Sequence, residues 1–171
     1  MDECVNIAQL QTIEASVDEL SALLIEVVAD GASVGFLPPL SHTEARAYWQ
    51  NVLSPEVILF AAIHNGTIAG TVQLQLCTKP NGQHRAEIAK LMTHPGYRRK
   101  GIARLLMQHA EERAKQEGIT LLVLDTRDGD PSNALYTALG YVKAGQIPCY
   151  AKSADGELQA TNFYYKISEE S

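Results

Sequence analysis

The chain has 171 residues and a mass of 18.7 kDa, which suits one domain with a sizeable core and leaves too little sequence for two. Hydrophobic residues make up 46% and charged residues 20%, a composition that excludes a disordered or fibrous protein. The formal charge of −6 disfavours a nucleic-acid-binding surface and leaves room for a cationic small substrate. We therefore expect one domain spanning residues 1–171.

Neither the N-terminal sequence nor the cysteines indicate a special compartment or a metal. The N-terminus has no basic segment followed by an apolar run, and no stretch approaches the length of a membrane span. Cys4, Cys77 and Cys149 are far apart, without the close Cys or His spacing of a zinc site. We expect a cytoplasmic protein without metal, nucleic-acid or membrane partners, as a monomer or homodimer.

The first half of the chain carries clear helix and turn signals. Ser16, followed three residues later by Glu19, predicts a capping box for a helix that Gly31 ends. Ser41 is suited to cap a second helix. Asn65-Gly66, between two β-rich runs, is the pair best suited to a two-residue hairpin turn. The expected elements of this half are a strand within 4–13, helices at 16–31 and 42–52, and a hairpin at 56–76.

The second half continues with alternating strands and helices. The apolar positions of residues 101–118 recur at helical spacing, and Gly118 ends that helix. Asp130 and Pro131 are typical of a helix start. Further elements are expected as strands at 85–93, 119–126, 141–148 and 158–167 and a short helix at 130–140. This order predicts a mixed α/β sheet.

The stretch "RRKGIARLLM", residues 98–107, places three cations and a glycine directly before an apolar helix. The N-terminal N–H groups of such a helix and its dipole favour an anion. Gly101 lets the backbone approach a phosphate closely, and Ala103 keeps the first turn unobstructed. Positive charge would come from Arg98, Arg99, Lys100 and Arg104. A purely solvated helix start is disfavoured, because these cations oppose the dipole.

The junction resembles a known family motif. Residues 98–103 match the pattern [QR]-x-x-G-x-[GA] of the GNAT superfamily of N-acetyltransferases, and "NALYTALGY" resembles its N-x-x-x-Y-x-x-x-G-[FY] segment, one residue short in the first spacing. The resemblance implies the GNAT fold, a mixed and mostly antiparallel seven-stranded sheet flanked by about four helices. It also implies acetyl-coenzyme A (acetyl-CoA), with its pyrophosphate in the loop. The cofactor-binding residues would be Leu91, Met92, Arg98, Arg99, Lys100, Gly101, Ile102, Ala103, Arg104, Asn133 and Tyr136.

Scattered blocks resemble one subfamily more closely. The blocks "GASVGF", "KPNG", "RAE", "KLM" and "LDT" are similar to tabtoxin-resistance acetyltransferases. This resemblance implies an acceptor that is a β-lactam amino-acid toxin.

Three residues are candidates for proton transfer. Glu87 lies in the expected strand 85–93, where the family often carries a carboxylate that deprotonates the amine, and the resemblance implies that Asp125 shares this work. Tyr136 matches the family tyrosine that protonates the leaving sulfur. Each has an ordinary alternative: a salt-bridged strand carboxylate for Glu87, a turn cap for Asp125 and core packing for Tyr136.

The resemblance further implies a bulge around Leu91 and Met92, whose backbone N–H polarises the acetyl carbonyl. The small and apolar loop 31–36 would then form a wall or lid over the acceptor. An equally good alternative packs Val34 and Phe36 into the core. The candidate acceptor-side residues are Ser33, Val34, Phe36, Lys79, Asn81 and Tyr150.

These patterns predict an N-acetyltransferase that moves the acetyl group of acetyl-CoA to a small amine by direct transfer in a ternary complex. A cysteine intermediate is disfavoured, because no cysteine has an evident activating neighbour. Two alternatives stay open: acetylation of a protein or peptide amine, and a noncatalytic module that senses acyl-coenzyme A.

Overall fold

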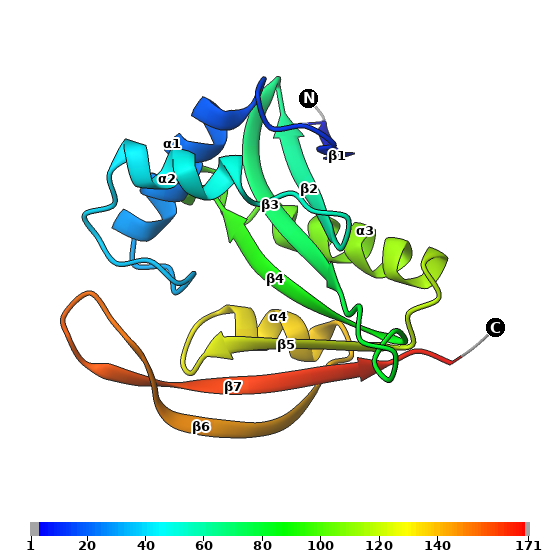
Figure 1. Ribbon diagram of the computed structural model, residues 1–171. Helices are drawn as coiled ribbons and strands as arrows, with labels where there is room; N and C mark the ends of the chain where they lie inside the picture. Colours follow the sequence, from blue (N-terminus) through cyan, green and yellow to red (C-terminus); the bar gives the residue numbers. More distant parts are fainter. Residues whose placement is uncertain (1–3, 170–171) are drawn as a thin grey trace.

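A single sheet organises the protein, and the computed structural model describes residues 4–169 of it. The strand order is β1-β2-β3-β4-β5-β7-β6, and β4 and β5 form the parallel pair in an otherwise antiparallel sheet (Figure 1). The strands are β1 (Val5–Gln9), β2 (Val57–His64), β3 (Thr67–Leu76), β4 (Arg85–Thr93), β5 (Leu121–Arg127), β6 (Val142–Lys152) and β7 (Leu158–Ile167). The helices are α1 (Val17–Ala29), α2 (His42–Gln50), α3 (Ile102–Gln116) and α4 (Ser132–Ala138), with a short 3₁₀ turn at Pro95–Tyr97. The expected mixed fold is confirmed.

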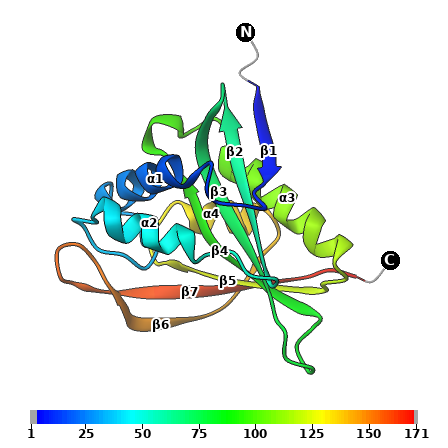
Figure 2. The ribbon, with the colours of Figure 1, turned by 45° about the horizontal axis from the view of Figure 1, so that its top comes forward.

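Helices cover both faces of the sheet. Figure 2 shows α1 and α2 side by side on one face and α3 on the other. Leu20, Leu24 and Trp49 are fully buried against the first face, and Leu106 and Met107 of α3 against the second. Burial of this apolar surface fixes which way each side chain of the central strands points.

The structure contains the turns and helix ends that the sequence predicts at residues with special backbone conformations. Asn65 and Gly66 both have positive φ, 49° and 79°, as a two-residue hairpin turn requires. Gly31 has φ 95° directly after α1, and Ser41 caps α2 by accepting from the Glu44 N–H at 3.1 Å. The predicted hairpin turn, the predicted end of α1 and the predicted start of α2 are therefore confirmed.

Two helix starts differ from the sequence expectation. Ser16 makes no side-chain cap, because its backbone is already near-helical, and the Glu19 carboxylate instead accepts from the Ile68 N–H of β3 at 2.6 Å. The predicted capping box is thus wrong. At α4 the N-cap is Pro131, and the Asp130 carboxylate pairs with Arg127. The Asp130 carboxylate bonds to a guanidinium, and the Glu19 carboxylate bonds to a strand N–H in place of an N–H of its own helix start.

Candidate active site

A cleft opens where β4 and β5 separate. The two strands pair only from Arg85↔Leu121 to Glu87↔Val123 and then diverge (Figure 1). The cleft has a volume of about 370 Å³ and lies between the two strands, the α1–α2 loop and the start of α4. Ligands of open α/β sheets bind beyond the carboxyl ends of such parallel strands.

Two carboxylates face this cleft from the two diverging strands. Glu87 and Asp125 both line it, and Asp125 accepts a hydrogen bond from the Thr161 hydroxyl at 2.9 Å. Burial in the cleft, and next the charge of Asp125, raise the pKa of Glu87, while the Lys90 ammonium lowers it. Glu87 is therefore a better proton acceptor than an ordinary surface glutamate.

Lys90 is a cleft residue that sequence reasoning did not single out as functional. It lies at a bulge in β4 and has φ 52°, and its ammonium approaches Gly35 of the α1–α2 loop. Burial lowers the pKa of Lys90, whereas Asp125 and Glu87 act in the opposite direction. Lys90 thus places a cation beside the carboxylates of Glu87 and Asp125.

β4 has a bulge, as the family resemblance implied, but it falls at Lys90 and Leu91, one residue before the expected pair Leu91 and Met92. The pairing of β3 with β4 shifts register between Thr71↔Met92 and Gln73↔Ala89, so that β4 holds one extra residue. Leu91 lines the cleft, whereas Met92 is buried beneath α1. A bulge takes backbone groups out of the strand ladder and leaves them available to a ligand.

Tyr136 connects the cleft to the core. It lies in α4, is only 5% exposed and packs against the rings of Tyr141 and Tyr164. It also lines the cleft. Burial, and then the negative charge of Asp125, raise the pKa of Tyr136, so that its hydroxyl stays protonated. Tyr136 therefore both packs in the core and holds a proton at the cleft.

The cationic loop before α3 has the features that a pyrophosphate requires. Gly101 is the N-cap of α3 with φ 74°, and a side chain there would meet no described atom within 4 Å. The N–H groups of the first turn, including those of Ile102 and Ala103, have no intrahelical acceptor. Arg98, Arg99, Lys100 and Arg104 are exposed, and Arg98 pairs with Asp30 at the end of α1. Backbone donors and cations thus fit the pyrophosphate of acetyl-CoA.

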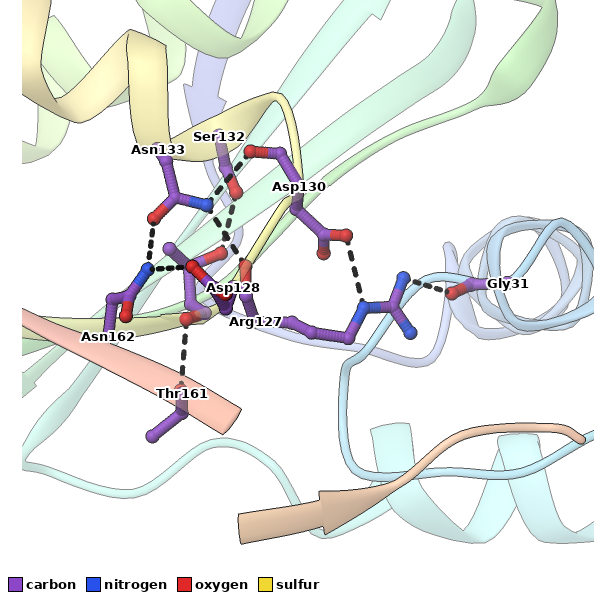
Figure 3. A network of polar contacts seen from close by, with 9 residues as sticks. Gly31, Arg127, Asp128, Asp130, Ser132, Asn133, Thr161 and Asn162 are labelled. Atoms are coloured by element: carbon purple, nitrogen blue, oxygen red, sulfur yellow. Dashed lines mark hydrogen bonds and ion pairs between the residues drawn. The ribbon is translucent and has the colours of Figure 1, made fainter. Parts of the chain in front are cut away.

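Asn133 is the centre of a polar network (Figure 3). Its amide donates to the carbonyls of Arg127 and Asp130, both at 2.9 Å. Its oxygen accepts from Asn162 at 2.9 Å and from the Tyr164 hydroxyl at 2.8 Å. These four bonds use the full capacity of the side chain, so that Asn133 fixes the β5–α4 turn.

A guanidinium holds the α1–α2 loop over the cleft. Arg127, at the end of β5, donates through Nε to Asp130 at 3.0 Å and through a terminal nitrogen to the Gly31 carbonyl at 2.9 Å (Figure 3). The Asp130 contact is an ion pair within the β5–α4 turn. The loop is therefore tied to the turn that leads into α4, the helix that carries Tyr136.

The predicted acceptor residues divide into three groups. Ser33, Val34 and Tyr150 line the cleft. Phe36 packs on Tyr48 with ring centroids 5.3 Å apart and lines a neighbouring cavity, in keeping with the alternative that it tucks inward. Lys79 and Asn81 are exposed in the β3–β4 loop and do not line the cleft.

None of the helices among residues 4–169 is long and apolar enough to cross a membrane. The same residues contain no group of three or more potential metal-binding side chains.

Comparison with known proteins gives a consistent result. Residues 25–141 match the model of the acetyltransferase (GNAT) family. An uncharacterised N-acetyltransferase of Azospirillum brasilense is 37% identical over 109 residues, which cover 60% of this chain and 63% of that protein. The ribosomal protein bS18 alanine N-acetyltransferase of Escherichia coli K12 is 26% identical over 77% of this chain and 92% of its own length.

The fold has close structural counterparts. A Salmonella typhimurium protein, solved with its cofactor acetyl-CoA, superposes with a TM-score of 0.80 at 16% identity, covering 98% of this chain and 95% of that one. These similarities do not single out the tabtoxin-resistance subfamily. The matched family model covers well over half of the chain, and the protein is therefore a member of the GNAT family of acetyltransferases, which use acetyl-CoA.

Proposed function

We propose that this enzyme transfers the acetyl group of acetyl-CoA to a primary amine of a small molecule, directly in a ternary complex. One observation carries the proposal. Glu87, Asp125 and Tyr136 all line a single cleft beside the β4 bulge. A base for the amine, an acid for the leaving sulfur and free backbone donors are thereby available at one place.

In this proposal the carboxylates prepare the amine. Glu87 accepts a proton from the incoming ammonium, and its raised pKa brings it nearer to the amine in proton affinity. Asp125, held by Thr161, shares the work by keeping the ammonium in place as it loses that proton. Both carboxylates line the cleft, where the acceptor would lie.

Tyr136 serves at the other end of the reaction. Acetyl-CoA, when bound, supplies the acetyl thioester. The Tyr136 hydroxyl holds a proton for the departing sulfur, and the bulge at Lys90 and Leu91 offers backbone N–H groups to the acetyl carbonyl oxygen. The loop residues Arg98 to Arg104 hold the pyrophosphate.

The acceptor is proposed to be small because the cleft is partly covered. The loop that contains Ser33 and Val34 lies over it, and Arg127 fastens this loop through the Gly31 carbonyl. A toxin or antibiotic amine is the finer proposal, which rests on the sequence blocks similar to the tabtoxin-resistance subfamily.

A second candidate is the N-terminal amine of a protein or peptide. It is favoured by the similarity to the bS18 alanine N-acetyltransferase, which extends over 92% of that relative. Such an acceptor requires the α1–α2 loop to leave room in the cleft for a polypeptide chain.

The test is the release of free thiol from acetyl-CoA with a panel of amines. The panel holds β-lactam amino acids, dipeptides, polyamines, aminoglycosides and short peptides that begin with alanine. We expect turnover with a small amine to exceed turnover with the peptides. A preference for the peptides would move the assignment to the second candidate, and silence across the panel would overturn both.

A further inference from the structure

A second cavity adjoins the catalytic cleft. It has a volume of about 250 Å³ and lies between the α1–α2 loop and the tip of the β6–β7 hairpin. Ser33, Gly35, Arg127 and Ala151 line both cavities. The guanidinium of Arg127 therefore lies in the wall that the two cavities share.

The two cavities differ in charge. The lining of the cleft includes three carboxylates, Glu87, Asp125 and Asp130, and two cations, Lys90 and Arg127. The second cavity is lined by the cations Arg127 and Lys152 and by no carboxylate of residues 4–169, with Phe36 and Leu37 among its apolar side chains. A positive, partly apolar cavity is suited to an anion joined to a short carbon skeleton.

Both cations have donors to spare. Arg127 uses its Nε for Asp130 and one terminal N–H for Gly31, which leaves three of its five N–H groups without a partner among residues 4–169. The Lys152 side chain makes no hydrogen bond or ion pair within the same part of the chain. A carboxylate in this cavity could accept hydrogen bonds from charged N–H groups that make no hydrogen bond within residues 4–169.

We propose that the second cavity is an anion subsite, and that the acceptor is a small amine with a carboxylate at its far end. This inference rests on the proposed function, because it places the amine at Glu87 and Asp125. Those carboxylates line only the cleft, and Lys152 lines only the second cavity. A molecule that reaches both must therefore carry its two charges apart, as a dipeptide does and a single α-amino acid does not.

The experiment compares acceptors that differ only at the far end. Thiol release from acetyl-CoA is measured with glycylglycine and glycylglycinamide, and with glycine and glycinamide as the short pair. For the long pair we expect kcat/KM to favour the carboxylate by about 10-fold, since a charge-assisted contact in a partly exposed site has roughly that effect. The short pair should show a smaller preference, because its carboxylate lies too near the amine to enter the subsite.

Two variants test the residues, and a third is a matched control. Lys152→Gln should reduce the preference for glycylglycine over its amide by about threefold, and Arg127→Gln should bring it close to one. Lys143→Gln removes the same charge from an exposed position of β6 that lines neither cavity, and should leave the preference unchanged. A general loss of structure would lower kcat/KM for glycylglycine and for glycylglycinamide alike, and would not change the ratio of the two values.

The outcomes separate the two proposals. Turnover of both long acceptors at equal kcat/KM, or a preference that survives both variants, overturns the subsite and leaves the proposed function standing. Acetylation of other small amines of the panel but of none of these four acceptors also overturns it. If no small amine causes thiol release from acetyl-CoA, the proposed function is overturned, and the subsite with it.

Discussion

The loop before α3 and the cleft between β4 and β5, the two proposed binding regions, are built in different ways. The loop is one continuous stretch whose cations are exposed and whose proposed phosphate-binding groups are mainly backbone N–H groups. The cleft draws its side chains from β4, β5, α4 and the α1–α2 loop, and it mixes carboxylates with cations.

This difference indicates a division of labour. Backbone donors at a helix start bind a phosphate with little dependence on any one side chain. In the cleft, by contrast, the charges of Asp125 and Lys90 act on the pKa of Glu87, and the charges of Asp125 and Glu87 act on the pKa of Lys90. Variants in the loop should therefore change affinity for acetyl-CoA, and variants in the cleft should change turnover and its dependence on pH.

The largest effect is expected from Tyr136→Phe. The change removes the proton donor of the cleft and keeps the ring that packs on Tyr141 and Tyr164. It should lower kcat by about 10²- to 10⁴-fold and leave KM for acetyl-CoA nearly unchanged. Steady-state thiol release measures both constants. An unchanged kcat would remove Tyr136 from the mechanism.

Glu87→Gln should have the next largest effect. It keeps the size of the side chain and abolishes its ability to accept a proton, so that kcat should fall about 10- to 100-fold, with Asp125 supplying the remainder. The double variant with Asp125→Asn should lose more than either single variant. A double variant no slower than Glu87→Gln would show that Asp125 takes no part in turnover.

Gly101→Val tests the other region. A β-branched residue at φ 74° is strained by roughly 1–2 kcal/mol, and relief of that strain distorts the phosphate loop. KM for acetyl-CoA should rise by about 5- to 30-fold, with a smaller change in kcat.

Gly118→Val is the matched control for this change. Gly118 has φ 77° at the opposite end of α3, and a side chain there would also meet no described atom within 4 Å. Thermal unfolding should show similar losses for both variants. A rise in KM for Gly118→Val as large as that for Gly101→Val would contradict a specific role of the loop.

The smallest effect, a displacement of the pH profile, tests the coupling inside the cleft. The base must be deprotonated, so that kcat/KM rises with pH through the pKa of Glu87. Lys90→Met removes the cation that lowers this pKa, and the acidic limb should move to higher pH. Asp125→Asn removes the anion that raises it, and the limb should move to lower pH. Shifts in the same direction would exclude Glu87 as the titrating base.

Much of the fold could be predicted because local rules decided it. The turn at Asn65-Gly66 and the helix end at Gly31 depend on backbone conformations that few residues adopt. The strand β4 was predicted with its observed bounds. Glu19 was assigned wrongly, because its partner, the Ile68 N–H, lies 49 positions away in the sequence.

The cleft was harder to predict, and Lys90 shows why. In a regular strand Lys90 would share a face with Ala86 and Ile88, which pack toward α3. The bulge changes the face, so that Met92 packs beneath α1 and Lys90 lines the cleft. The family resemblance placed the bulge around Leu91 and Met92, but the strand pattern alone gave no sign that a lysine would turn inward. Likewise, nothing local in the sequence reveals that Arg127 reaches Gly31.

Every hydrogen-bonding group of the Asn133 side chain has a partner, and this limits which residues the fold can accept at position 133. Aspartate has nearly the same shape, yet it would set a carboxylate oxygen against the carbonyls of Arg127 and Asp130, where the amide now donates. The two bonds accepted from Asn162 and Tyr164 would survive that exchange. Position 133 is thus one at which the most similar residue is expected to be among the least tolerated, and spontaneous deamidation there would loosen the turn that leads into α4, the helix of Tyr136.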